Sequence, residues 1–274
     1  MSSSRRWSSP ARRALTAVAV LAAVLAVPAC AFRETSIEAG RTHLTSVATA
    51  NYDFSGGSHL DRLYDLLDRG PEGAVDAAGP ALELDLALMR EIEDVDGRRV
   101  LQPIRDGDVL LDGYARPGEG DGLKLRVQVD RPCHLYVIQV DATARPTRLF
   151  PNAGWSTVSN PIQAGRPYRL PEGNVLFPLG PSRGIETLYV VATEEPFTEL
   201  EALLEEHVAA PWREHEAPAI VERALCIDRG IAGDRRSEAN AVVAPSGALS
   251  DVESRKYVGR PGRHLVVTRW FRHE

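Results

Sequence analysis

The chain has 274 residues, of which 43% are hydrophobic and 26% charged, a composition ordinary for a globular protein of one or two domains. The net charge is −6, and residues 1–29 hold four arginines and no acid, so the remainder carries 28 basic against 38 acidic side chains. Such an acidic chain lacks the basic face that displaces counterions from a nucleic acid, which excludes nucleic acid as a partner.

Residues 1–29 have the pattern of a secretory signal peptide. Arginine pairs at 5–6 and 12–13 precede an uninterrupted apolar run at 14–29 that ends in small residues. This run is too short to span a bilayer comfortably. The sequence Val27-Pro28-Ala29-Cys30 resembles the bacterial lipobox, which implies that Cys30 becomes the lipid-modified first residue of the mature protein. A plain cleaved signal or an uncleaved anchor is the alternative.

The lipobox resemblance also predicts where the mature protein resides. Several acyl chains on Cys30 would anchor it stably, because a single chain binds a membrane only marginally. Ala31 differs from the aspartate that, in lipoproteins of Gram-negative bacteria, retains the product at the inner membrane. We therefore expect a lipid-anchored protein of the cell envelope, at the outer membrane facing the periplasm if the host is Gram-negative.

The two remaining cysteines are candidates for a disulfide. With Cys30 acylated, Cys133 and Cys226 are left in an oxidising compartment, where a pair is more often bridged than free. Two buried, inert thiols are the alternative. Cys133 and His134 are adjacent on a predicted strand, so their side chains point to opposite faces and cannot pair as nucleophile and base.

Residues 30–79 are predicted to form a tether and one short helix. The tether is rich in Ser, Thr, Ala and Gly, and the helix begins after Ser58. The β-rich part then begins near Leu82, where ALELDLAL alternates as a strand does, although a helix competes there. Residues 123–129 also alternate, which predicts a strand with one buried face and one face toward water.

Two later runs, at 134–140 and 186–193, are apolar on both faces and predict central strands that are covered on both sides. Pro151 and Pro178 are predicted to end strands or mark sheet edges, because proline cannot donate to a strand ladder. A capping box of Thr198 with Glu201 begins a helix that could cover the second face of the central strands.

The C-terminal residues 210–274 are predicted to form an extension. Residues 230–254 are charged or turn-rich, and we expect much of this stretch to be mobile. The run HLVVTRWF at 264–271 has strand-like composition, and this last strand is a candidate to pair with the sheet.

The order of seven short motifs resembles a bacterial family, the domain of unknown function 4384, over roughly residues 90–208. The motifs are Gly107-Asp108, Leu135-Tyr136-Val137, Leu149-Phe150-Pro151-Asn152, Asn160 with Ala164-Gly165, 168–171, Gly184-Ile185-Glu186 and Tyr189-Val190-Val191-Ala192. The resemblance implies a compact β-sandwich module without established chemistry. The predicted fold is therefore mainly β, with a β-sandwich-like module at residues 80–209 and a few flanking helices.

We find no catalytic motif in the sequence, and predict no cofactor and no metal. The glycines at 118–122 precede a strand rather than a helix, so they do not form a phosphate-binding turn. The aspartates at 106, 108 and 112 suggest a calcium loop, but Leu110 and Pro117 occupy positions where such a loop needs oxygen ligands, so a structural turn is the preferred interpretation. The seven histidines lack zinc-like spacing. The protein is therefore predicted not to be an enzyme.

The candidate site is a binding patch in a turn-rich connection, where aromatic side chains on a loop can act as anchors. It consists of Phe150, Pro151, Asn152, Trp155 and Asn160. The more conservative interpretation is that the two aromatic residues fold inward and cap the sandwich. We expect an adaptor or structural element that binds envelope proteins and is attached to the membrane through its lipid anchor. The alternative is an enzyme or glycan-binding protein acting on cell-wall or surface polymers.

Overall fold

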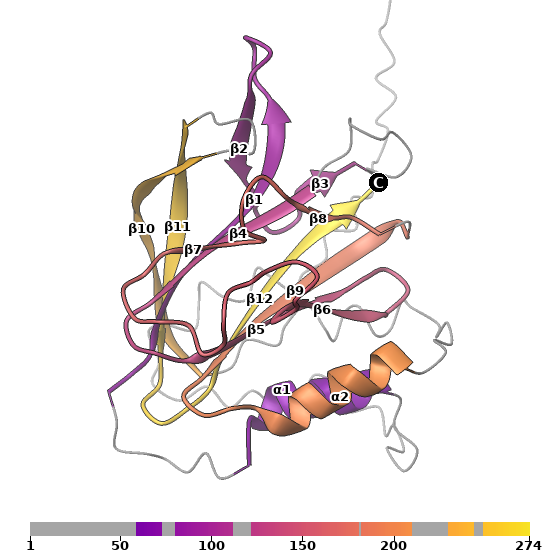
Figure 1. Cartoon of the computed structure of the whole chain (residues 1–274), viewed down its shortest axis with the longest axis vertical. Coiled ribbons are helices and arrows are strands. Elements are labelled where there is room, and N and C mark those ends of the chain that lie inside the picture. The colour runs from indigo at the N-terminus through magenta and orange to yellow at the C-terminus, as the bar shows by residue number, and fades with distance from the viewer. Residues whose placement is uncertain (1–58, 73–79, 112–121, 181, 210–229, 244–248) are drawn as a thin grey trace, which may run out of the picture. The chain divides into compact units, whose positions relative to one another are not determined.

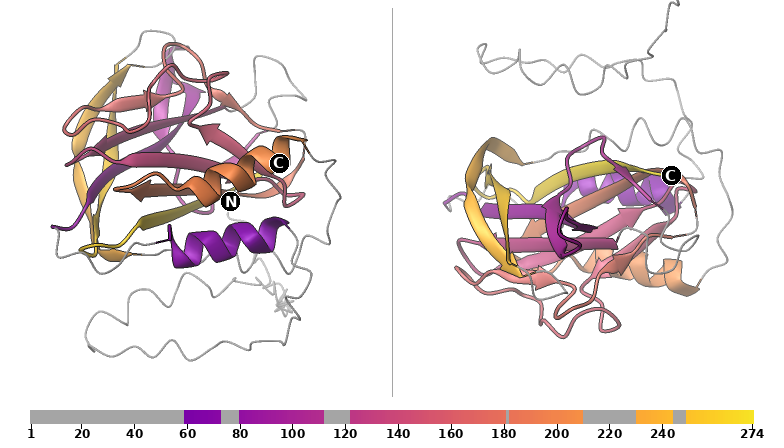
Figure 2. Two further views of the ribbon diagram at one scale, coloured as in Figure 1. Left: turned by 60° about the horizontal axis from the view of Figure 1, so that its bottom comes forward. Right: turned by 90° about the horizontal axis from the view of Figure 1, so that it is seen from above.

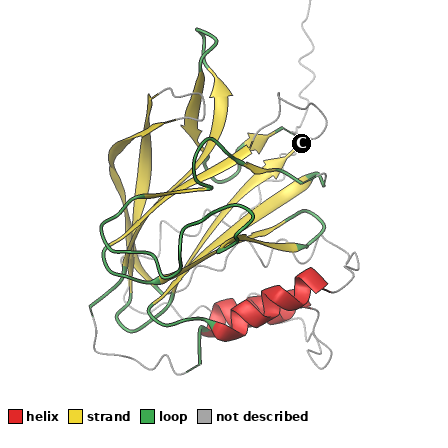
Figure 3. Ribbon diagram, viewed as in Figure 1, coloured by secondary structure: helices red, strands yellow, loops and turns green. Residues whose placement is uncertain are grey.

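The computed structural model describes residues 59–72, 80–111, 122–180, 182–209, 230–243 and 249–274. The signal segment, Cys30, the tether before residue 59 and Cys226 lie outside these residues. The described part consists mainly of strands in two packed sheets, with two helices (Figures 1 and 3). This confirms the prediction of a mainly β, sandwich-like fold with few helices.

The larger sheet has seven strands, and its main path runs β10-β11-β1-β4-β7. These strands are β10 (Ile231–Val243), β11 (Leu249–Gly259), β1 (Glu83–Glu93), β4 (Gly122–Val129) and β7 (Tyr168–Leu170). Two short strands lie off this path, β2 (Arg99–Pro103) beside β1 and β8 (Phe177–Pro178) beside β4. All pairings in this sheet are antiparallel.

The smaller sheet has the order β3-β12-β9-β5-β6. Its strands are β3 (Val109–Leu110), β12 (Leu265–His273), β9 (Gly184–Thr193), β5 (His134–Val140) and β6 (Pro146–Phe150). Only the short β3 runs parallel to its neighbour. Strand β6 ends directly before Pro151 and forms an edge of this sheet, as the sequence predicted.

The main core lies between the two sheets and is built by alternate residues of each strand. Leu84 and Leu86 of β1 and Leu125 of β4 belong to the same buried cluster as Val190 of β9 and Val267 of β12. Each of these side chains is almost fully buried. Because the period of a strand is two, the residues between them point to the opposite faces of the sheets.

Helices α1 (His59–Arg69) and α2 (Thr198–Ala209) cover the outer face of the smaller sheet (Figures 1 and 2). Tyr136 and Tyr189 from the sheet pack in one buried cluster with Leu63 of α1 and Leu203 of α2. The Tyr136 hydroxyl donates to Glu201 at 2.7 Å and accepts from the backbone amide of Phe197 at 2.9 Å. The prediction that central strands are covered on both faces, with α2 on one of them, is confirmed.

The predicted water-facing side of β4 is wrong. Lys124 is 1% exposed and Arg126 is 6% exposed. The Lys124 ammonium donates to the carbonyls of Gly173 and Val175, each at 2.9 Å, so the connection between β7 and β8 lies over it. Arg126 lies 3.4 Å from the carboxylate of Asp85 on the neighbouring strand β1. Strand alternation identifies the two faces of a strand but does not show which loop later covers the polar one.

The C-terminal residues contribute three strands to the sheets. The expected last strand is present as β12, which pairs with β9 along its whole length. The charged stretch at 230–254, which we expected to be mobile, instead contains β10 and part of β11, paired with each other. Polar residues such as Asp234 and Arg235 are compatible with β10 because it is an edge strand with a solvent-exposed side.

Candidate functional site

The predicted binding patch lies in the connection after β6, and the structure turns part of it inward. Phe150 is fully buried in the main core. Trp155 is half-buried and packs edge-on against Phe177, with ring centroids 5.7 Å apart. Pro151 is half-buried between them in sequence. The conservative interpretation, in which both aromatic side chains cap the sandwich, therefore describes their positions.

The side chains of the two asparagines in the predicted patch are hydrogen-bonded to backbone groups of the protein itself. Asn160 accepts from the amide of Leu135 at 2.9 Å and donates to the same residue's carbonyl at 3.1 Å, as a neighbouring strand would. Asn152 donates to the carbonyl of Arg148 and accepts from the amide of Gly154, both at 2.9 Å. These contacts fix the path of the loop, because backbone groups near the core need partners.

Cys133 carries a free, fully buried thiol, and burial raises its pKa to about 12. A thiol with so high a pKa is mostly protonated at neutral pH and is a poor nucleophile. Its backbone forms an isolated bridge with Ile162. The structure therefore does not show the predicted disulfide bridge from Cys133, whose expected partner Cys226 lies outside the described residues.

A buried polar cluster lies inside the sandwich on the facing sides of β5, β9 and β12. Glu186 accepts from the Gln139 amide at 2.8 Å, and its other oxygen lies 3.5 Å from Nδ1 of His273. Both Glu186 and His273 side chains have no exposed surface. Burial raises the pKa of Glu186 above the ordinary range of a glutamate. The pair resembles an acid–base couple, but a substrate in solution could not reach it without opening the sandwich.

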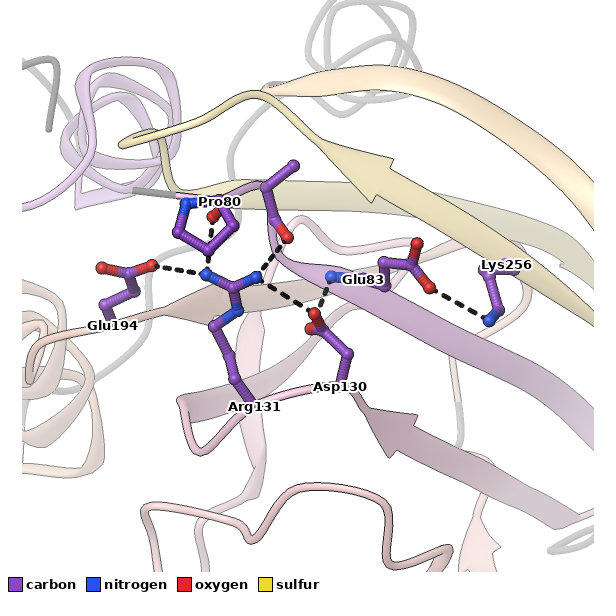
Figure 4. Close-up of polar contacts among 7 residues, drawn as sticks. Pro80, Glu83, Asp130, Arg131, Glu194 and Lys256 are labelled. Carbon is purple, nitrogen blue, oxygen red and sulfur yellow. Dashed lines mark hydrogen bonds and ion pairs between the residues drawn. The ribbon is translucent and has the colours of Figure 1, made fainter. Parts of the chain in front are cut away.

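A second polar cluster, which we call the Arg131 clasp, lies where the chain enters β1 (Figure 4). The Arg131 guanidinium donates to the carbonyls of Pro80 and Ala81, each at 2.6 Å. It also contacts the Asp130 carboxylate at 3.1 Å and the Glu194 carboxylate at 3.5 Å. Asp130 in turn accepts from the backbone amide of Glu83 at 2.8 Å. The clasp therefore joins the entry to β1 with the β4–β5 turn and the end of β9.

A further candidate feature is a large apolar side chain on an exposed turn. Val95 is 103% exposed at the tip of the β1–β2 hairpin. Sequence reasoning missed both Val95 and Arg131. A valine between two aspartates in an Asp-Gly turn was a usable signal for Val95, since nothing in such a turn buries it. Arg131 had no such signal, because its partners are backbone carbonyls fifty residues away.

Within the described ranges, no group of three His, Cys, Asp or Glu side chains is arranged to hold a metal ion. Neither of the two described helices is long and apolar enough to cross a membrane. The polar clusters are instead bonded to the protein's own backbone and side chains. Together the fold and these clusters define a two-sheet β-sandwich module with a helical cover.

Part of this β-sandwich module matches a known protein family. Residues 118–196 match the model of a domain of unknown function, DUF4384, and this domain contains β4 through β9. The match lies inside the span of the predicted resemblance but is shorter, and it leaves out the Gly107-Asp108 motif. No curated protein matches the chain. No solved structure matches it.

Proposed function

We propose that the protein is a membrane-anchored envelope lipoprotein whose β module acts as a structural or protein-binding adaptor. The N-terminal sequence supports the anchor, through its arginine pairs, its apolar run and the cysteine at position 30. The chemistry of the described residues supports an adaptor, because the buried charged groups pair within the fold and the most exposed apolar side chain lies on a turn.

The observation that carries the proposal is the Arg131 clasp. A module held by a tether on its N-terminal side must keep its first strand in place when the tether is pulled. The clasp fixes Pro80 and Ala81, which lie shortly before β1, to the β4–β5 turn and, through Glu194, to the end of β9. Hydrogen bonds from a charged group are the stronger kind, each contributing about 1.5–3 kcal/mol. The clasp thus connects the entering chain to both sheets.

The adaptor role fits this geometry better than wall-polymer chemistry does. Glycan binding through stacked rings needs exposed aromatic faces, and the ring of Trp155 is packed against Phe177. Hydrolysis needs a carboxylate or histidine that a polymer can reach, whereas Glu186 and His273 are fully buried. No observation in the described part of the chain favours the enzyme on its own.

The anchor is tested by expressing the full chain and its Cys30→Ser variant in a bacterial host. We expect wild-type protein in the membrane fraction, with a covalent lipid on Cys30 seen by mass spectrometry of the N-terminal peptide. The variant should lack the lipid and leave the membrane fraction. An unmodified Cys30 in processed protein would contradict the anchor.

The adaptor role is tested by bifunctional amine cross-linking in intact cells, followed by purification under denaturing conditions. We expect one or a few envelope proteins to be joined to the wild type and not to Cys30→Ser, because the variant is mislocalised. Cross-linked products that are identical for both proteins would contradict an adaptor that works at the membrane.

A further inference from the structure

The β1–β2 hairpin extends beyond the body of the larger sheet. Strand β1 pairs with β4 only as far as Arg90, and its last three residues pair with β2 alone. Figure 1 shows this hairpin reaching past the neighbouring strands. Its tip therefore stands clear of the sandwich.

The tip is held in one conformation by its own hydrogen bonds. One carboxylate oxygen of Asp94 accepts from the amides of Asp96 at 2.9 Å and Arg98 at 2.8 Å. The Asp94 amide donates to the carbonyl of Arg98 at 2.8 Å, and Gly97 provides the positive φ of 74° that the turn requires. The fully exposed Val95 is thus presented on a preformed turn, which lowers the entropy cost of binding through it.

The base of the hairpin is braced against the sandwich. The Arg90 guanidinium donates to Oε1 of Gln102 across the hairpin and, at 2.7 Å, to the carbonyl of Val109 on β3. On the outer face, Met89 and Leu101 are buried in a small apolar cluster with Val252 of β11. A projecting element that is braced in this way can transmit a load to the fold.

Three further large apolar side chains are exposed on other segments of the described chain. In the described residues four large apolar side chains are exposed, namely Val95, Val109, Leu111 and Val175. The Val109 carbonyl is bonded to Arg90, and the Val175 carbonyl is bonded to Lys124, which pairs with Met89 of β1. Leu111 directly follows β3. By strand alternation Arg90 lies on the main-core side of the larger sheet and Lys124 on the opposite side, so Val109 and Val175 do not share a face. We call the hairpin tip, residues 94–98, the hairpin surface, and Val95 is its exposed apolar side chain.

The charges beside Val95 favour a protein over a lipid partner. Asp96 and Arg98 form an ion pair at 3.8 Å, and Glu91 and Arg99 form another at 3.5 Å. Arg98 and Arg99 are therefore paired with carboxylates of the hairpin itself, and Asp94 adds a further negative charge at the tip. Anionic headgroups attract unpaired Lys and Arg side chains, and interfacial insertion uses aromatic residues, which the hairpin surface lacks.

Strand addition at a sheet edge is poorly supported as an alternative. Among the described strands, the edge strand β10 has two register shifts along its pairing with β11 and carries Asp234 and Arg235. The opposite edge of the larger sheet, β7, has three residues, and the edge strand β6 is flanked by prolines. Bulges, charges, prolines and short length are the features that protect edges from pairing.

We propose that the hairpin surface is the docking site of the adaptor, and that Val95 inserts into an apolar pocket of a second envelope protein. The inference rests on the proposed adaptor function and specifies its surface and the chemistry of its partner. The partner's pocket is predicted to be apolar, because the tip presents one fully exposed aliphatic side chain.

The test places a photoreactive phenylalanine at position 95 of the full chain in cells, and in a second variant at position 153. Ala153 is exposed in the connection after β6 and serves as the matched control site. We expect one partner to be cross-linked from position 95 and not from 153, with the same mass as a partner found by amine cross-linking. A cross-link from 153 alone would overturn the hairpin surface as the docking site.

Substitutions then test whether the side chain of Val95 itself contributes to binding. Val95→Asp should lower recovery of that partner at least about tenfold, as loss of a central anchor does. Val95→Ile and Ala153→Asp should keep it within about twofold. All three should retain the wild-type unfolding temperature, because neither position is buried. Wild-type recovery with Val95→Asp would overturn the inference.

The remaining outcomes identify a wrong occupant. A dimer in sedimentation velocity that dissociates in Val95→Asp would assign the surface to a second copy. Binding of the Cys30→Ser protein to phosphatidylglycerol vesicles that is lost in Val95→Asp would assign it to lipid. If amine cross-linking identifies partners but the photoreactive residue at position 95 captures none, only the hairpin surface as the docking site is overturned. Absence of partners from both methods would overturn the adaptor function as well.

Discussion

At the scale of single residues, the buried polar side chains of this protein are held by specific partners. Lys124 donates to two carbonyls, Arg126 lies beside Asp85, and Glu186 accepts from Gln139. A buried polar group without a partner lowers the stability of the fold. Replacing either residue of such a side-chain pair is therefore expected to be destabilising.

Glu186 gives a prediction about the pH dependence of stability. Burial is the main cause that raises its pKa, and the contacts with His273 and Gln139 lower it by less. A carboxyl whose pKa is higher in the folded state stabilises the fold below its unfolded pKa, and this contribution is lost as the pH rises through the folded pKa. Glu186→Gln cannot ionise. We expect its free energy of unfolding to exceed that of the wild type increasingly as the pH rises above about 4.

Glu172→Gln is the matched control, with the opposite sign. Hydrogen bonds from Thr157 lower the pKa of Glu172, so its contribution is present above its unfolded pKa and is lost as the pH falls. Urea unfolding of both variants between about pH 3 and pH 8 measures the two slopes, that of Glu172 at the acid end of the range and that of Glu186 above about pH 4. A constant difference between wild type and Glu186→Gln over this range would contradict the prediction.

At the scale of elements, two turns of this protein are fixed by polar side chains, one through distant contacts and one through local contacts. The clasp uses the β4–β5 turn to hold the entry to β1, and the hairpin turn holds itself through Asp94. Neither turn belongs to the hydrophobic core. Their side chains act through backbone groups, so a change of side-chain geometry should be felt even where charge is kept.

Arg131→Lys tests the clasp in this way. Lysine keeps the charge but cannot present the planar fork that reaches two carbonyls at once. We expect the free energy of unfolding to fall by about 1–3 kcal/mol and the Glu83 amide to exchange faster with solvent. Arg148→Lys is the control, because Arg148 is similarly exposed but, among the described residues, has one ion pair, at 4.0 Å with Glu205. Its expected change is below about 1 kcal/mol. Equal effects of the two substitutions would contradict the clasp.

Elements whose sequence has a strong hydrophobic pattern were predicted correctly. The prediction failed where the burial of a side chain depends on a segment far away in the sequence. Residues 134–140 and 186–193 were recognisable as central strands because they are apolar on both faces. The burial of Lys124 was not predictable, since the residues that cover it lie about fifty positions away. Residues 231–243 lack apolar alternation, and only their pairing with β11 makes them a strand.

The candidate site was predicted less well than the fold. Phe150 and Trp155 were identified as aromatic residues on a connection, but alternation along β6 could not show that the chain folds back over Phe177. Asn160 was identified by resemblance, while its bonds to Leu135 depend on how two loops meet. Geometry of this kind follows from tertiary packing and has no local pattern.

At the scale of the molecule, the DUF4384 domain is completed by strands from both flanks. Residues 118–196 supply β4, β7 and β8 to one sheet and β5, β6 and β9 to the other. Their neighbours β1 and β12 come from outside this range. Strand β12 alone buries Leu265, Val266, Val267 and Phe271. At about 1.5–3 kcal/mol for each side chain, this is comparable to the whole stability of a typical domain.

We therefore expect residues 59–274 to fold cooperatively, and neither residues 59–259 nor residues 118–196 to do so. Thermal unfolding followed by circular dichroism, together with the spread of amide proton shifts, distinguishes the three. Both shorter fragments lack β12, so β9 would lose its pairing partner from Gly184 to Ala192. A cooperative transition for residues 118–196 would show that the flanking strands are dispensable.

The position of β12 also affects the order in which the protein can form. This strand follows every other described strand along the chain, yet it lies inside a sheet, between β3 and β9. A chain made from its N-terminus therefore completes every other described strand before β12 exists. Until then β3 and β9 lack the strand that joins them, so the smaller sheet closes only at the last step of synthesis.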